Sequence, residues 1–130
     1  MTLVDTTFLI DLQKGDRNPF RQAAEHWLEE HIHEELRIPA IVFGEFAEGF
    51  EDPTHPLLAR YRLGYQIVSA DVAVAQTYGQ LSRRLRLSGE NIGSNDTWIA
   101  ATAVSHGYAL LTRNVNHFRR IAELTLSEYC

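Results

Sequence analysis

The sequence has little cysteine, no excess of positive charge and no long apolar run. The single cysteine, Cys130, is the last of 130 residues, so no intrachain disulfide can form, which fits a reducing compartment. A formal net charge of −5 argues against a basic, non-specific nucleic-acid binder. No stretch approaches the roughly 20 apolar residues that span a bilayer, and the N-terminus has no basic leader. We therefore expect a cytoplasmic protein that is not attached to a membrane.

Internal repeats, low-complexity tracts and linkers rich in Ser or Gly are also absent. Hydrophobic residues make up 45% of the chain and charged residues 22%, both near the average for globular proteins. A chain of this length is sufficient to bury one hydrophobic core. We therefore expect residues 1–130 to form a single domain.

Short apolar stretches alternate with segments of helical periodicity along the chain. The expected strands are residues 3–4, 36–38, 65–69 and 108–111, with an edge strand at 124–127. The expected helices are residues 8–15, 19–33, 39–50 and 71–87, and one that follows a loop at 88–95 and ends near residue 106, with short helical turns at 57–63 and 116–121. This alternation predicts an α/β fold, a three-layer α/β/α sandwich with a mostly parallel sheet of four or five strands.

Three acids fall where such a fold would bring them to one edge of the sheet. Asp5 directly follows the first strand, and ligands of open parallel sheets gather at the carboxyl ends of the strands. Asp96 lies in the first turn of the helix that leads into the fourth strand, behind Ser94 or Asn95 as N-cap. That helix must begin at the carboxyl edge to feed a parallel strand. Glu45, less than two turns into its helix, leans toward the same edge.

A cluster of three carboxylates needs compensating positive charge, because like charges repel each other and favour protonation. A divalent cation supplies that charge. Oxygen ligands without a neighbouring set of Cys or His favour Mg²⁺, or Mn²⁺, over Zn²⁺. Such a cation activates water and stabilises the charge that develops on a phosphodiester. The residues therefore predict metal-assisted hydrolysis.

Sequence blocks around the three acids resemble a known family over essentially the whole chain. "LVDTTFLIDL" contains Asp5, "VFGEFAEGF" contains Glu45, and "IGSNDTWIAATAVSHGYALLTRNVNHF" contains Asp96 and the strand-end run "TRN". Together they resemble the PIN-domain family, specifically the VapC-type toxins of toxin–antitoxin pairs. The stretch "IGSNDTWIAATA" is the most specific part of the match.

The resemblance implies a PIN-like fold and a Mg²⁺-dependent endoribonuclease, the toxin of a type II pair, which hydrolyses RNA. Asp5, Glu45 and Asp96 would be its catalytic and metal-binding residues. It also implies a homodimer, and inhibition by a small antitoxin that inserts a basic side chain into the acidic cleft. Such a contact is charge-assisted and would displace the metal.

One departure from the family pattern leaves alternatives open. Many members carry a fourth acid within or just after the "TRN" block, whereas this chain has Asn114, Val115, Asn116 and His117. Asn114 or Asn116 could hold a metal-bound water but brings no charge, so a single-ion mechanism stays open. The missing acid motivates a second hypothesis, a catalytically silent PIN-like module that binds a protein partner. DNA cleavage is a third, because acids that activate water do not tell ribose from deoxyribose.

Each candidate also has a purely structural interpretation. Asp96 could complement the helix dipole, and Glu48 or Glu51 could take the place of Glu45. Three threonines at strand ends could orient ligands or waters, or could simply bond the local backbone: Thr6, Thr7 and Thr112. Trp98 is expected to pack rather than to stack on a base.

Arginines form the basic surface of this acidic chain. One cluster lies at a helix end, and its members either contact RNA or are solvated: Arg83, Arg84 and Arg86. The same alternatives apply to Arg113, Arg119 and Arg120. We expect His106 and His117 to be local hydrogen-bonding groups.

Overall fold

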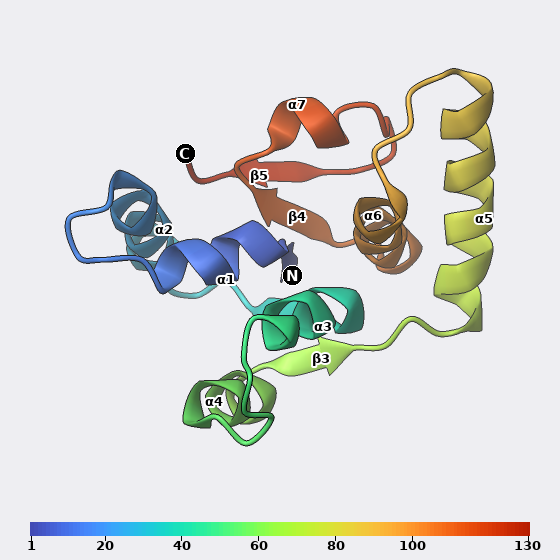
Figure 1. Cartoon of the computed structure of the whole chain (residues 1–130). Helices are drawn as coiled ribbons and strands as arrows, with labels where there is room; N and C mark the ends of the chain where they lie inside the picture. Colours follow the sequence, from blue (N-terminus) through green and yellow to red (C-terminus); the bar gives the residue numbers. More distant parts are fainter.

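The computed structural model describes residues 1–130 and contains five strands and seven helices, which alternate along most of the chain (Figure 1). The strands are β1 (Thr2–Val4), β2 (Leu36–Pro39), β3 (Gln66–Val68), β4 (Ala109–Thr112) and β5 (Leu126–Glu128). The helices are α1 (Thr6–Leu12), α2 (Pro19–Glu30), α3 (Ala40–Glu48), α4 (Pro56–Gly64), α5 (Val72–Leu87), α6 (Ser94–His106) and α7 (Val115–Phe118).

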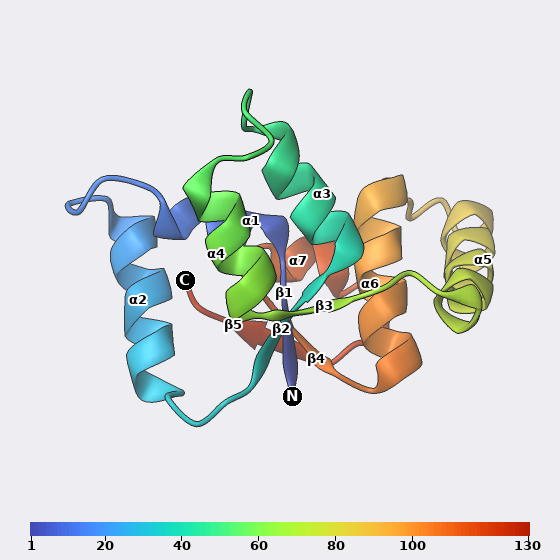
Figure 2. The same cartoon turned by 90° about the horizontal axis from the view of Figure 1, so that it is seen from below.

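The five strands form one sheet in the order β3-β2-β1-β4-β5, and all four pairings are parallel. Helices α2 and α4 lie on one side of the sheet and α5 and α6 on the other (Figures 1 and 2). The predicted α/β sandwich with a parallel sheet is therefore confirmed, and the C-terminal segment provides the edge strand β5. Because β1 is central, the residue that follows it lies in the middle of the carboxyl edge.

Apolar residues of the central strands and of α6 form the middle of the core. Leu3 and Leu110 are completely buried, as are Ala100, Ala101 and Ala103 of α6. Small side chains at these positions let α6 lie close to its neighbours, and it is placed between the sheet and α5 (Figure 1). None of the seven helices combines the length and apolar character needed to cross a membrane.

The start of α6 differs from the prediction. Neither Ser94 nor Asn95 is its N-cap, because both already lie within the first turn. The cap is Gly93, with φ +94° and ψ 153°, and the Thr97 hydroxyl donates to its carbonyl at 2.7 Å. An extended backbone with positive φ suits glycine almost alone, so a residue without a side chain takes the place of a polar cap. Asp96 remains in the first turn.

Other boundaries follow local chemistry with small shifts. Asp71 caps α5 as predicted, because its Oδ1 accepts from the Val74 backbone N–H at 3.0 Å. Pro39 ends β2 and precedes α3, whereas we expected it in the first helical turn. Helix α2 ends at Glu30, before the predicted limit at residue 33, which leaves the Ile32 side chain exposed.

Candidate active site

Asp5 lies at the junction of β1 and α1 and is only 3% exposed. Its Oδ1 accepts from the Thr6 backbone N–H at 2.7 Å, and its Oδ2 accepts from the Thr112 hydroxyl at 2.8 Å. Burial raises the pKa of Asp5 and the negative charges of Asp96 and Glu45 add to the rise, whereas the two hydrogen bonds lower it. The balance raises the pKa to about 6.

Thr112 orients Asp5 from the carboxyl end of β4. Its hydroxyl donates to Asp5 and accepts from the Asn114 backbone N–H at 3.0 Å. A hydroxyl with both a fixed acceptor and a fixed donor has little rotational freedom. Thr112, which is fully buried, therefore holds one carboxylate oxygen of Asp5 in place.

Glu45 of α3 is tied to the same junction through Thr6. Its Oε1 accepts from the Thr6 hydroxyl at 2.7 Å, and its Oε2 accepts from the Asn95 side-chain amide at 3.4 Å. Thr6 thus contacts Asp5 with its backbone and Glu45 with its side chain. The neighbouring acids Glu48 and Glu51 are exposed and make no such contact, so Glu45 is the acid of this region that faces Asp5.

Asp96 lies in the first turn of α6 and is half-buried. Its Oδ2 lies 2.9 Å from Nε2 of His117, which also lies 2.9 Å from the Ile92 carbonyl oxygen. Because a carbonyl only accepts, Nε2 carries the proton. This N–H group is shared as a donor between the two oxygens. Burial raises the pKa of Asp96, His117 lowers it and the charge of Glu45 raises it; the net shift is upward.

The three predicted acids therefore lie at one edge of the sheet and influence each other electrostatically. No three side chains of the His, Cys, Asp and Glu types are arranged as a ready-made ligand set for one ion. A buried carboxylate with a raised pKa, beside two further acids, nevertheless fits a site that gains stability from a cation. The hard oxygen donors suit a hydrated divalent ion better than a closed protein cage.

The amide side chains proposed for water binding are not drawn into this cluster. Asn114 is exposed and contacts Thr112 only through its backbone N–H. The Asn116 side chain is exposed and accepts from Arg119 at 3.1 Å. Neither amide group contacts an acid of the site.

The arginines have separate surroundings. Arg83 and Arg86 are exposed on the last turns of α5, and Arg84 forms an ion pair of 2.8 Å with Glu123. Arg120 donates to the Asn91 carbonyl at 2.9 Å, in the loop that leads into α6. Arg113 instead pairs with a buried acid, Asp11, at 2.8 Å.

Three contacts of this region were missing from the sequence analysis. We expected His117 to bond locally, yet its Nε2, in α7, contacts Asp96, which lies 21 positions earlier in the chain. Asn95 was assigned to a helix cap, yet its amide faces Glu45. The contacts of Asp11 are not predicted from the sequence either, although its place in the apolar helical stretch "FLIDL" is a signal of a buried charge.

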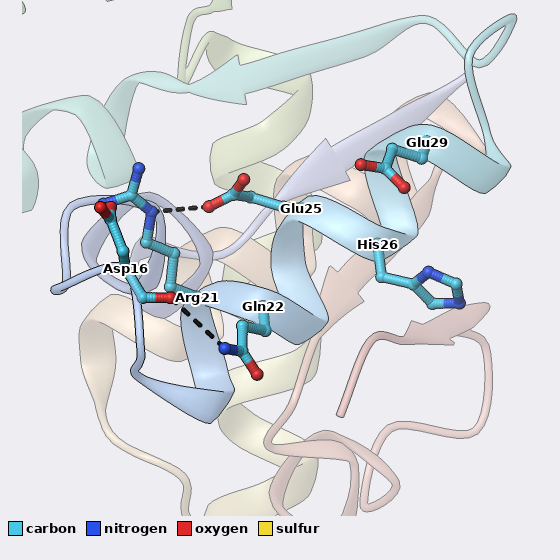
Figure 3. Close-up of a pocket in the computed structure, with 6 residues that line it drawn as sticks. All are labelled: Asp16, Arg21, Gln22, Glu25, His26 and Glu29. Carbon is cyan, nitrogen blue, oxygen red and sulfur yellow. Dashed lines mark hydrogen bonds and ion pairs between the residues drawn. The ribbon is translucent and has the colours of Figure 1, made fainter.

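Two hollows lie away from the acids. One, of about 510 Å³, is lined only by polar residues of α2 and the preceding loop, including Asp16, Arg21 and Glu25 (Figure 3). Arg21 already pairs with Asp16 at 2.8 Å and with Glu25 at 2.6 Å, so its charges are compensated. The second, of about 660 Å³, lies between α3 and α4 and is partly apolar, with Phe43 and Leu58 in its lining.

Comparisons with known proteins identify the family and the relatives of this chain. The PIN domain family matches residues 2–124. Ribonuclease VapC1 of Methanocaldococcus jannaschii is 33% identical over 128 residues, which covers 98% of this chain and 85% of the relative. Ribonuclease VapC4 of Mycobacterium tuberculosis is 31% identical over 119 residues, with 86% and 85% covered. The 2.2 Å resolution structure of VapBC-1 from nontypeable Haemophilus influenzae superimposes with a TM-score of 0.77 at 27% identity, covering 98% of this chain and 97% of its counterpart.

The chain therefore belongs to the PIN-domain family. Its relatives place it among the VapC-type members of that family.

Proposed function

We propose that this protein is the toxin of a type II toxin–antitoxin pair and a metal-dependent endoribonuclease that hydrolyses RNA. The observation that carries the proposal is the grouping of Asp5, Glu45 and Asp96 at the carboxyl edge of the sheet, in a chain whose relatives are named ribonuclease VapC. Residues 1–130 act as one PIN-like domain in this proposal, and the cytoplasm is its place of action.

The same three carboxylates hold the cation, which we assign as Mg²⁺ with Mn²⁺ as a substitute. A bound divalent ion supplies a water of lowered pKa and offsets the charge that develops on the phosphate. Asp5 is the most firmly held ligand, because Thr6 and Thr112 fix both of its oxygens. His117 orients Asp96 in the way that outer partners orient metal-binding carboxylates.

RNA reaches the site over the side formed by the end of α5 and by α7. Arg83 and Arg86 are exposed there, and Arg120 is joined to the loop before Asp96 through the Asn91 carbonyl. These arginines offset the repulsion between a chain of net charge −5 and a phosphate backbone. Arg84 and Arg119 extend this surface, although each already has a partner.

A small antitoxin is the protein partner in this proposal, and the active form is a homodimer. The antitoxin inserts an arginine or lysine among the three carboxylates, where a charge-assisted hydrogen bond replaces the cation. Several solved structures with this fold are of VapBC proteins or toxin–antitoxin complexes, including a toxin–antitoxin complex from Klebsiella pneumoniae at 26% identity. The antitoxin and the RNA therefore compete for one acidic site.

The test compares cleavage of total RNA by the purified protein and by Asp5→Asn and Asp96→Asn, with and without Mn²⁺. We expect the cleavage rate of each variant to fall by at least roughly 100-fold. Mutating a residue that only hydrogen-bonds to a metal ligand already lowers activity about 10–100-fold, and these variants change the ligands themselves. Asp16→Asn is the matched control, since it removes one exposed carboxylate that pairs with Arg21 and is not among the groups that shift the pKa of Asp5 or Asp96. Undiminished cleavage by either site variant, with Mn²⁺ present, would refute the assigned roles.

The alternative of a silent binding module is supported by the missing fourth acid and by the absence of a ready-made ligand set. Calorimetric titration with Mn²⁺ distinguishes the nuclease from the silent binding module. The nuclease binds the ion and loses that binding in Asp96→Asn, whereas the module shows no binding that depends on Asp96. Parallel assays on single-stranded DNA test the third alternative, cleavage of deoxyribose substrates by the same acids.

A further inference from the structure

A buried ionic centre lies beside the acidic site and has no place in the mechanism above. We call it the Asp11 cluster, and it consists of Asp11, Lys14, Arg113 and Tyr129. Oδ2 of Asp11 accepts from Nε of Arg113 at 2.8 Å and from the Tyr129 hydroxyl at 2.6 Å. Oδ1 has no other partner than the ammonium of Lys14, at 2.8 Å. The cluster joins α1, the turn after β4 and the C-terminal end of the chain.

The cluster is firmly built. Asp11 is completely buried, and burial by itself raises the pKa of its carboxyl group. The donors Lys14, Tyr129 and Arg113 outweigh burial, so the pKa lies below its ordinary value and the carboxylate is charged. The Arg113 guanidinium also lies 4.1 Å from the centre of the Phe20 ring, and the Tyr129 ring packs edge-on against Phe8 at 5.0 Å. Directional bonds and ring contacts thus hold the same groups.

The polypeptide chain connects this cluster to the candidate active site at two places. Arg113 follows Thr112, whose hydroxyl donates to Asp5, and it precedes Asn114, whose N–H donates to that hydroxyl. Asp11 lies on α1, the helix whose N-cap is Asp5. One buried carboxylate therefore anchors both the helix that starts at Asp5 and the turn that carries its hydrogen-bond donor.

We propose that the Asp11 cluster is a positioning device, in which Arg113, Asp11 and the C-terminal Tyr129 lock the turn at residues 112–114 so that Thr112 holds Asp5. In this inference the four residues act through the turn and not through contact with substrate or ion. Their effect on catalysis rests on the proposed nuclease function, whereas their effect on the geometry of the turn does not. Arg113, considered above as an RNA contact, acts in this inference through its bond to Asp11.

A matched pair of tyrosine variants tests whether the Asp11 cluster positions the turn. Tyr129→Phe removes the hydroxyl that bonds Asp11 and keeps the ring against Phe8. Tyr108→Phe is the control, because its hydroxyl also bonds an ion-paired side chain, accepting from Arg37 at 3.1 Å, but just before β4, away from the carboxyl edge. Amide hydrogen exchange of the full chain, followed by NMR at Asn114 and Thr6, reads the turn directly without RNA or metal. Cleavage of an RNA oligonucleotide gives kcat and KM.

We expect Tyr129→Phe to speed exchange at the Asn114 amide by roughly 10-fold, because local opening controls exchange. We also expect kcat to fall by about 10-fold with KM within twofold, since Thr112, the donor to the metal-binding carboxylate of Asp5, is then held less firmly. Arg113→Lys, which keeps the charge but not the planar fork, should behave in the same way. Tyr108→Phe should change neither quantity.

Unchanged exchange at Asn114 in both Tyr129→Phe and Arg113→Lys would overturn the inference. So would equal effects of Tyr129→Phe and Tyr108→Phe, because the cluster would then be merely structural. If the wild-type chain cleaves no RNA while exchange responds as expected, the nuclease proposal fails and the positioning of the turn stands. If the wild type cleaves RNA and only exchange responds, the catalytic part of the inference is wrong.

Discussion

Two aspartates six residues apart show how partners decide the charge of a buried carboxylate. Asp5 and Asp11 are both almost fully buried, at 3% and 0% exposure. The pKa of Asp5 is raised to about 6, because its donors are neutral and its charged neighbours are acids. The pKa of Asp11 is lowered, because its partners include the cations of Lys14 and Arg113. Burial costs both carboxylates the same kind of desolvation, and only Asp11 has cations to offset it.

At the residue scale, we predict that Asp5→Asn stabilises the metal-free protein at neutral pH. An acid with a raised pKa binds more protons in the folded state between about pH 4 and 6, so the free energy of unfolding falls as pH rises through that window. Removing the charge should therefore raise the free energy of unfolding by up to about 3 kcal/mol at pH 7. Urea denaturation in EDTA at pH 7 and pH 4 measures the difference.

The gain should shrink toward pH 4, where Asp5 is protonated in the folded state. Asp16→Asn, an exposed acid, should show little change at either pH. A gain of the same size at both pH values would mean that shape, and not charge, decides the effect at position 5.

At the scale of the element, the start of α6 determines where Asp96 lies. The helix begins after Gly93, whose backbone conformation is nearly exclusive to glycine, and a Cβ there would meet no atom within 4 Å. Backbone strain would therefore be the main cost of a side chain at this position. A cap without a side chain leaves Asn95 and Asp96 free to face Glu45 and His117.

We predict that Gly93→Ala lowers the free energy of unfolding by about 1–3 kcal/mol through strain at positive φ. Gly79→Ala is the matched comparison, because Gly79 lies within α5 at ordinary helical angles and also has open space around it. That substitution should stabilise the protein by about 0.5–1 kcal/mol. Chemical denaturation of both variants measures the two shifts, and shifts of the same sign would contradict this account of the α6 N-terminus.

At the scale of the whole molecule, a net charge of −5 and a group of three acids around the buried Asp5 predict that divalent cations stabilise the fold. Ligand that binds only the native state adds about 2.7 kcal/mol when its concentration is 100 times Kd. For a domain of this size that gain raises the Tm by roughly 10 °C. Thermal melts with Mn²⁺ and with EDTA measure it.

The variant Asp96→Asn should lose most of this stabilisation, whereas Asp16→Asn should keep it. Stabilisation that survives in Asp96→Asn would place the ion elsewhere on the acidic surface. Monovalent salt at equal ionic strength controls for general screening of the charge.

Sequence periodicity was sufficient to predict the parallel sheet and the edge at which Asp5, Glu45 and Asp96 lie. Hydrophobic spacing reports which residues pack, and a strand that ends in an acid places that acid at the carboxyl edge. The cap of α5 at Asp71 could be predicted for the same reason, since it depends on residues three positions apart. The cap of α6 could not, because Ser94 and Asn95 have equal claims as caps and glycine gives no capping signal of its own.

The sequence by itself determined the order of strands and helices along the chain and the positions of the three acids within it. Tertiary structure alone decided which side chains contact the buried aspartates: Thr112 bonds Asp5 across 107 positions, and Tyr129 bonds Asp11 across 118. Local propensity acts over a few residues and hydrophobic burial has no direction, so both place elements without choosing partners. Hydrogen bonds are short and directional, and their donors are therefore selected only when the sheet has brought distant segments together.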